Sequence, residues 1–173
     1  MKRNIQPQTF LFEDDGYVPN NPRLPLVHYR GVMDFIGIAD PEVSIEETFH
    51  ANHWGESWRN GIYNYAHYHS SIHEAMGIAR GRAKVRFGGG KGQEIDLVQG
   101  DVVVLPAGTG HQSLWTSPDL VVIGAYPKSG RYDLCRATKV DHDRALGAIA
   151  NVPLTDTDPV FGMSGPLLRL WQS

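Results

Sequence analysis

The chain has 173 residues, of which 41% are hydrophobic, and this length supports one domain with a sizeable core. Its formal net charge of −3 gives no support for nucleic-acid binding, which usually needs a basic surface. The start of the chain lacks an apolar signal core, no apolar run reaches membrane-spanning length, and the single cysteine excludes an internal disulfide, so we expect a cytoplasmic protein without a membrane partner.

Residues 1–30 predict an extended arm that is rich in turns. Residues 6–12 predict one short strand, and four prolines between Pro7 and Pro25 exclude a helix and restrict any strand to a sheet edge. The acidic residues 13–15 are explained more simply as a solvated turn than as a metal site. Residues 26–29 predict a further strand, which we expect to be an outer one, exchanged with a partner subunit or lying against it.

A helix is predicted to follow the arm. Asp40 has the residue type of an N-cap, and Pro41 suits the first helical position. We expect this helix to run to about His53 and to lie outside the barrel. His50 and His53 are three residues apart on it and could chelate a metal, but an exposed pair is the simpler interpretation.

Short strands then follow one another at regular intervals, with 19 glycines and 11 prolines in the chain to form the turns. After a turn at residues 55–61, we expect strands at residues 62–70, 74–80, 82–88, 93–98, 101–105, 112–115 and 120–126. Gly88 to Gly90 predict a hairpin turn because they lack the lysine and serine of a phosphate-binding loop. This spacing is typical of an all-β barrel or jelly roll, with its core at about residues 55–127.

Residues 127–173 are predicted to leave the barrel. Asp141 can cap a short helix with Leu146, Ile149 and Ala150 on its inner face. The apolar end, residues 167–171, is expected to pack on the domain or on a dimer partner. We therefore predict a single domain, with the arm and this extension packed on the barrel.

The most informative stretch for function is residues 61–81. His67 and His69 are two apart on a predicted strand, so their side chains project from one face, into a core or into a metal site. A His-x-His pair by itself says almost nothing in a chain with eight histidines. The addition of glycine and glutamate at fixed offsets makes an accidental match on the order of a thousand times rarer.

Two spaced patterns carry a family resemblance. The first, G-x5-H-x-H-x4-E-x6-G, is satisfied by Gly61, His67, His69, Glu74 and Gly81. The second, G-x5-P-x-G-x2-H-x3-N, is satisfied by Gly100, Pro106, Gly108 and His111, with Trp115 in place of the asparagine. These patterns resemble the two signature motifs of the cupins. The flanks EDDGYVPNNPRLPL, SWRNGIY, GAYP and DLCR extend the resemblance to the small bacterial YjlB-type cupins over nearly the whole chain.

The resemblance implies an RmlC-like double-stranded β-helix, a homodimer, and a metal held by His67, His69, Glu74 and His111. Such a set leaves one or two coordination positions open, which is the general form of a catalytic site. Nitrogen and oxygen donors without thiolate suit one divalent first-row ion, namely Fe, Mn, Ni, Co or Zn. His73 is next to Glu74 and should face the other way, so we expect it at the surface or behind the ligands.

Other residues are expected to shape the pocket. Tyr65 and Trp115 should share the inward face with the ligands, and Met76 and Ile78 should make the deeper wall apolar. Tyr65 could serve as acid or base, although a plain core role is the simpler interpretation. Arg59 could bind a carboxylate, although a surface position is simpler.

The sequence is compatible with three functions. The first is a metal-dependent enzyme, a dioxygenase or an isomerase, that acts on a small organic molecule. The second is a small-molecule or metal-binding module without turnover, and the third is a structural dimer-forming domain with a vestigial site. We favour the first, and because Cys135 has no histidine nearby in the sequence, hydrolysis through a covalent intermediate is unsupported.

Overall fold

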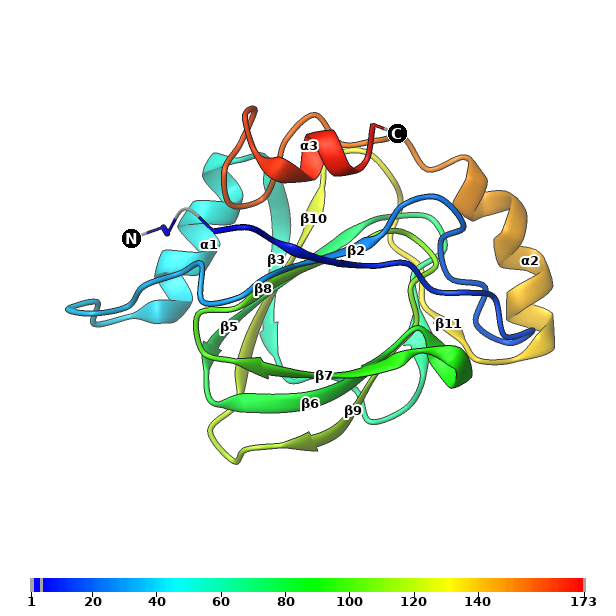
Figure 1. Cartoon of the computed structure of the whole chain (residues 1–173), viewed down its shortest axis with the longest axis horizontal. Coiled ribbons are helices and arrows are strands. Elements are labelled where there is room, and N and C mark those ends of the chain that lie inside the picture. Colours follow the sequence, from blue (N-terminus) through cyan, green and yellow to red (C-terminus); the bar gives the residue numbers. More distant parts are fainter. Residues whose placement is uncertain (1, 4, 173) are drawn as a thin grey trace.

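The computed structural model of the protein describes residues 2, 3 and 5–172, and it forms a β-barrel with three helices around it (Figure 1). The strands are Gln8–Phe10 (β1), Leu26–Tyr29 (β2), Trp54–Asn60 (β3), His67–Tyr68 (β4), Glu74–Arg80 (β5), Arg82–Phe87 (β6), Gln93–Val98 (β7), Val102–Leu105 (β8), His111–Thr116 (β9), Val121–Pro127 (β10) and Cys135–Arg136 (β11). The helices are Pro41–Ala51 (α1), Lys139–Ala150 (α2) and Pro166–Leu170 (α3), with a short 3-10 turn at Gly89–Lys91 (η1).

The strands form two antiparallel sheets. One has the order β1-β2-β8-β5-β10-β3 and the other the order β11-β4-β9-β6-β7. Apolar side chains that alternate along these strands fill the space between the sheets, with Met76 and Ile78 of β5 packed near Val85 and Phe87 of β6. The predicted all-β jelly-roll class is therefore confirmed.

A second core lies on the outer face of the six-stranded sheet. There α1 contributes Ile45 and Phe49, and the C-terminal segment contributes Leu167 and Trp171. Figure 1 shows α1 and α3 over this side of the barrel and α2 at the end near β11. In this structure the C-terminal end packs on the barrel through Leu167 and Trp171.

Most predicted strands are present, but three expectations were wrong. Residues 55–61 are not a turn, since β3 pairs along β10 as an edge strand, and this pairing overrides its polar composition. Residues 62–66 are not a strand, because they form a loop that accepts hydrogen bonds from β9, such as Ser113 N to the Tyr63 carbonyl at 2.9 Å. The strand β2 is not an outer strand, because it pairs with β1 and β8 of its own chain.

The predicted helices are present with adjusted ends. Asp40 caps α1 through Val43 N at 3.0 Å, and His50 and His53 are exposed, as the simpler interpretation predicts. The cap of α2 is Thr138 rather than Asp141, because the Thr138 hydroxyl accepts from Asp141 N at 3.2 Å. Leu146 is exposed on this helix, and its buried face is formed by His142, Ala145 and Ile149.

The hairpin between β6 and β7 forms as predicted, with η1 in its loop. In the described part of the chain, no helix combines the length and the apolar character needed to cross a lipid bilayer.

Candidate metal centre

The two sheets bring four predicted ligands to one end of the barrel. His67 of β4 lies directly opposite His111 of β9, while Glu74 begins β5 in the other sheet. His69 follows β4, and its carbonyl accepts a hydrogen bond from Gly108 N at 2.7 Å.

The motif glycine Gly108 is required by this arrangement. Its φ of +96° belongs to the left-handed region, and a Cβ at this position would lie 2.5 Å from the Asn20 carbonyl oxygen. The glycine therefore lets the N-terminal arm press against the loop that precedes His111.

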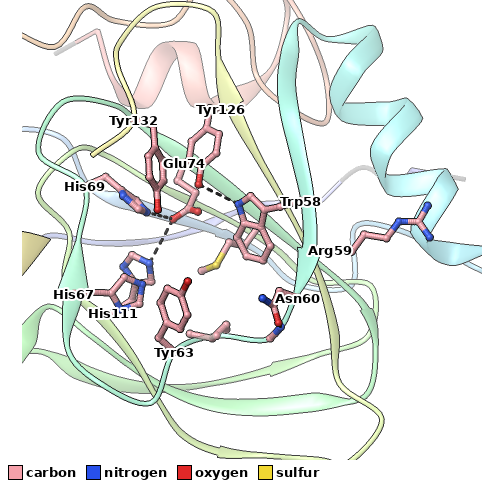
Figure 2. A pocket seen from close by; sticks show the side chains of 13 residues that line it. Trp58, Arg59, Asn60, Tyr63, His67, His69, Glu74, His111, Tyr126 and Tyr132 are labelled. Carbon is pink, nitrogen blue, oxygen red and sulfur yellow. Dashed lines mark hydrogen bonds and ion pairs between the residues drawn. The ribbon is translucent and has the colours of Figure 1, made fainter. Parts of the chain in front are cut away.

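A cavity of about 310 Å³ opens in front of these side chains (Figure 2). Its size is at the lower end of the range for small-molecule sites. It is lined by Trp58, Arg59, Asn60, Gly61, Ile62, Tyr63, His67, His69, Glu74, Met76, His111, Tyr126 and Tyr132.

The three histidines share one orientation. Nδ1 of His67 lies 3.0 Å from the Tyr65 carbonyl, Nδ1 of His111 lies 3.0 Å from the Thr109 carbonyl, and Nδ1 of His69 contacts the Asp133 carbonyl. Because a carbonyl can only accept a hydrogen bond, Nδ1 carries the proton in each ring, and a neutral ring keeps an Nε2 lone pair. This is the backing that metal-binding histidines usually have.

Glu74 provides the test of whether a cation fits. Its Oε2 is buried and forms no hydrogen bond within the described chain, yet His69 Nε2 and His111 Nε2 lie 3.3 and 3.4 Å away. The ligand atoms of these three residues all lie within 4.8 Å of one another. Ligand bonds of about 2.1 Å place neighbouring donors about 3 to 3.5 Å apart, so the donor set fits one transition-metal ion.

The electrostatics agree with this donor set. Burial raises the pKa of the Glu74 carboxyl, but the charge of the facing His69 ring in its protonated form, together with His111, outweighs burial and holds that pKa well below its usual range. Burial lowers the pKa of His69, but the Glu74 charge outweighs burial and raises it, so without an ion a proton takes the place of the cation between these two residues. Burial, followed by the neighbouring His111, lowers the pKa of His67 to about 3, so this ring stays neutral and able to coordinate. His67 lies beside the group of three, with its ring centroid 4.0 Å from that of His111.

His73 is neither at the surface nor in the cavity. It is fully buried, and its Nδ1 accepts from Ala107 N at 2.9 Å while Nε2 lies 3.1 Å from the Pro153 carbonyl. Its ring lies 4.7 Å from that of Trp171. His73 points away from Glu74 as expected, but it joins the barrel to the C-terminal segment, so the surface expectation was wrong.

Tyr65 and Trp115, which were expected on the inward face with the ligands, lie elsewhere. Tyr65 is absent from the cavity lining, because it stacks on Tyr63 with centroids 4.9 Å apart and Arg136 lies over its ring. Trp115 is 50% exposed and packs against Arg82. A bulge in β9 places one extra residue between Ser113 and Trp115, which turns Trp115 outward and breaks the predicted alternation.

Sequence reasoning missed most of the aromatic wall. Trp58 of β3 donates from Nε1 to the Tyr126 hydroxyl at 3.0 Å, and Figure 2 shows Tyr63 and Tyr132 on opposite sides of the cavity. The alternation of Tyr63 with Tyr65 in the sequence was the signal that could have identified Tyr63 as a cavity residue. Nothing local marks Tyr132, which lies in the loop between β10 and β11.

The remaining expectations concern Arg59, Cys135 and Met76. Arg59 is bound to Glu46 at 2.6 and 2.8 Å and is turned away from the cavity (Figure 2). Cys135 is buried, and burial followed by Asp133 raises the pKa of its thiol to about 11, so it is no nucleophile. Met76 lines the cavity as predicted, whereas Ile78 is absent from the lining and packs in the barrel core.

No protein-family model matches the chain. It is 40% identical over 164 residues to Uncharacterized protein YjlB of Bacillus subtilis (strain 168), which covers 95% of this chain and 96% of the relative.

Two solved structures are similar at lower identity. The epimerase RmlC of Legionella pneumophila Philadelphia 1, in complex with dTDP-4-keto-L-rhamnose, is 12% identical, with a TM-score of 0.41 over 87% of this chain and 86% of that one. The 11S globulin of Wrightia tinctoria is 17% identical, with a TM-score of 0.37 over 45% of this chain. The chain spans only 21% of the globulin's length. With its identity to YjlB along nearly the whole chain, its two spaced motifs and its two-sheet barrel, the protein belongs to the YjlB family of cupins.

Proposed function

We propose that the protein is a metal-dependent enzyme of the dioxygenase or isomerase type that acts on a small organic molecule. His67, His69, Glu74 and His111 would hold one divalent first-row ion. The observation that carries the proposal is Glu74 Oε2, a buried acceptor with two imidazole Nε2 atoms 3.3 and 3.4 Å away. Three acceptors this close repel one another unless a proton or a cation lies among them.

The bound ion would supply Lewis-acid polarisation of a ligand oxygen. The chain contributes orientation and water exclusion. The Asp133 and Thr109 carbonyls fix the rings of His69 and His111, and Met76 makes the inner wall apolar.

The cavity tyrosines can donate hydrogen bonds to a ligand. Burial, followed by the Glu74 charge, raises the pKa of Tyr126. Burial, followed by the neighbouring Tyr63, raises the pKa of Tyr132. Both phenols therefore stay protonated at neutral pH, beside the site of the ion. They are better placed than Tyr65, whose role as acid or base stays a prediction.

Elemental analysis of chelator-free, untagged protein tests the proposal. We expect one equivalent of a first-row metal in wild type and none in the His67→Ala/His111→Ala double variant. The exposed pair His50→Ala/His53→Ala is the matched control and should keep the metal, because His50 lies in the last turn of α1 and His53 follows the helix, both outside the centre. Wild type that takes up no ion, even after reconstitution with each candidate, would remove the proposal.

The identity of the metal directs the search for a reaction. Iron would call for oxygen-consumption screens, and zinc, manganese or nickel for isomerase screens. A metal-loaded protein that binds small molecules without turnover would support the alternative, a non-catalytic binding module.

A further inference from the structure

The charges that face the cavity determine which ligands can enter it. Among the lining residues, all of which lie in the described part of the chain, Glu74 and Arg59 alone belong to the Asp, Glu, Lys and Arg types. The Arg59 guanidinium is held by both Glu46 oxygens on the outer side of β3 (Figure 2). The lining therefore offers no free arginine or lysine to a phosphate or a second carboxylate.

The centre itself carries little charge. Three neutral imidazoles, one carboxylate and a divalent ion add up to one net positive charge. A ligand that coordinates the ion can therefore be neutral or lose one proton on binding. Any further negative charge on the ligand would be buried without a partner, which is costly in a low-dielectric site.

The walls favour an uncharged ligand with oxygen atoms. Trp58, Tyr63, Tyr126 and Tyr132 present rings to the cavity, and the tyrosines add hydroxyl groups that donate or accept hydrogen bonds. Amphipathic rings of this kind suit a small molecule that combines a carbon frame with several oxygens.

The wall at Tyr132 is built into the fold. The next residue, Asp133, accepts from Ser70 N at 2.9 Å and from Ser71 N at 3.2 Å through Oδ1. Its Oδ2 accepts from the Ser70 hydroxyl at 2.5 Å, and its carbonyl contacts His69 Nδ1. Asp133 therefore positions both the candidate ligand His69 and the ring of Tyr132. The centroids of these two rings lie 5.1 Å apart.

We propose that the centre binds a small uncharged molecule with two adjacent oxygen donors, such as a hydroxyketone or a vicinal diol. This inference rests on the proposed function. His67, His69, Glu74 and His111 would hold the ion, and two adjacent oxygens would suit the coordination positions that such a ligand set leaves free. Analogues that carry a phosphate or a second carboxylate are rejected, because the cavity lacks a cation to pair with them.

A matched pair of probes tests this inference. Protein loaded with Co²⁺ is titrated with dihydroxyacetone and with dihydroxyacetone phosphate, which share one hydroxyketone and differ in charge, and binding is followed by the visible Co²⁺ spectrum. We expect the phosphate ester to bind at least about tenfold more weakly, a difference of about 1.4 kcal/mol. Equal or tighter binding of the ester overturns the inference, as does failure of both probes to bind.

A charge-gain variant adds a second readout. Tyr63 lines the cavity and is 48% exposed, so Tyr63→Arg places a cation there, and the metal content of the variant is measured first because Tyr63 also contacts His67. This variant should gain affinity for the ester, whereas Tyr63→Phe should not. An ester affinity unchanged by Tyr63→Arg would show that the missing cation does not determine selectivity.

Two further probes distinguish between the two classes of ligand that carry adjacent oxygens. Catechol represents a flat aromatic diol, and erythrulose a sugar-like hydroxyketone. Preferential binding of either over oxalate, a dianion, supports the inference, and preference for oxalate contradicts it.

The metal content is measured before any probe is added. A protein that takes up no Co²⁺ removes the proposed function, whereas a loaded protein that prefers the ester removes only the inference about charge. The two failures are therefore distinguishable.

Discussion

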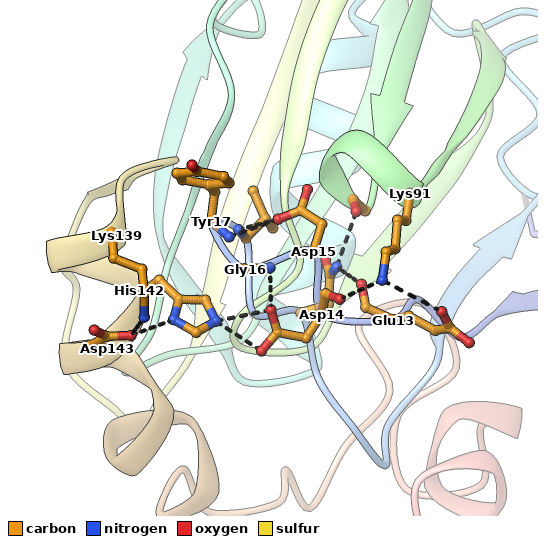
Figure 3. Close-up of polar contacts among 12 residues, drawn as sticks. Glu13, Asp14, Asp15, Gly16, Tyr17, Lys91, Lys139, His142 and Asp143 are labelled. Atoms are coloured by element: carbon orange, nitrogen blue, oxygen red, sulfur yellow. Dashed lines mark hydrogen bonds and ion pairs between the residues drawn. The ribbon is translucent and has the colours of Figure 1, made fainter.

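The buried histidines differ in what their two ring nitrogens meet. His67, His69 and His111 each have Nδ1 against a carbonyl, so Nε2 remains for a ligand. In His73 both nitrogens contact the backbone, so this ring is structural. His142 is different again, because both of its nitrogens face carboxylates (Figure 3).

His142 joins α2 to the N-terminal arm. Its Nε2 lies 2.9 and 2.8 Å from the two Asp14 oxygens, and its Nδ1 lies 2.8 Å from Asp143, which also binds Lys139. A neutral imidazole has one N–H and satisfies only one of these partners, whereas an imidazolium satisfies both. The hydrogen bonds with Asp143 and then Asp14 raise the pKa of His142 above its ordinary value of 6.5.

This predicts a pH-dependent stability. A folded-state pKa above the unfolded one stabilises the protein fully below about pH 6.5, and the contribution is lost as pH rises through the folded-state pKa. The excess unfolding free energy of wild type over His142→Gln should therefore shrink as the pH rises from about 6.5 through the folded-state pKa of His142. Urea unfolding of both proteins at constant ionic strength measures it, and the difference between them cancels the other titrating groups.

An excess that stays constant over this range would show that the imidazolium is not the form that bridges the two elements. The pKa of His142, followed by NMR in the folded protein, provides the independent check.

At the scale of elements, the strand pair β3 and β10 forms the wall behind the cavity. Trp58 crosses β10 at Gly124, where a Cβ would lie 1.9 Å from the indole. The glycine therefore lets the indole reach Tyr126, next to a bulge between Gly124 and Tyr126.

Replacement of Gly124 should displace the Trp58 indole from its position in the cavity wall. Gly124→Ala forces the indole aside, and we expect a loss of about 1 to 3 kcal/mol in unfolding free energy together with a shift in tryptophan fluorescence. Gly55→Ala is the control within the same strand pair, because a Cβ at Gly55 meets nothing within 4 Å. Equal stability of the two variants would mean that Trp58 relaxes without cost.

At the scale of the molecule, one core connects distant parts of the chain. Leu24 of the arm, Val102 and Ile123 of the barrel, and Leu167 and Trp171 of the C-terminal segment share a single apolar cluster. The arm and the C-terminal segment therefore stabilise the same sheet that carries Glu74.

A single cooperative unit follows from this shared cluster. Thermal unfolding should give one transition, with the same midpoint by tryptophan fluorescence and by far-UV circular dichroism. Two separate midpoints would contradict the single-domain prediction. The homodimer expected from the family resemblance stays a prediction as well, and light scattering of the purified protein measures it.

The sequence by itself determined the fold class and most of the strands, and its resemblance to the cupin motifs implied the four candidate ligands. These features depend on local properties, namely side-chain alternation, turn residues and motif spacing, and β5 and β7 appear with the predicted bounds. Tertiary structure decided the rest. The bulge in β9 turned Trp115 outward, pairing with β10 made residues 54–60 a strand, and the C-terminal segment buried His73. Each of these outcomes depends on contacts between residues far apart in the chain, which local patterns do not contain.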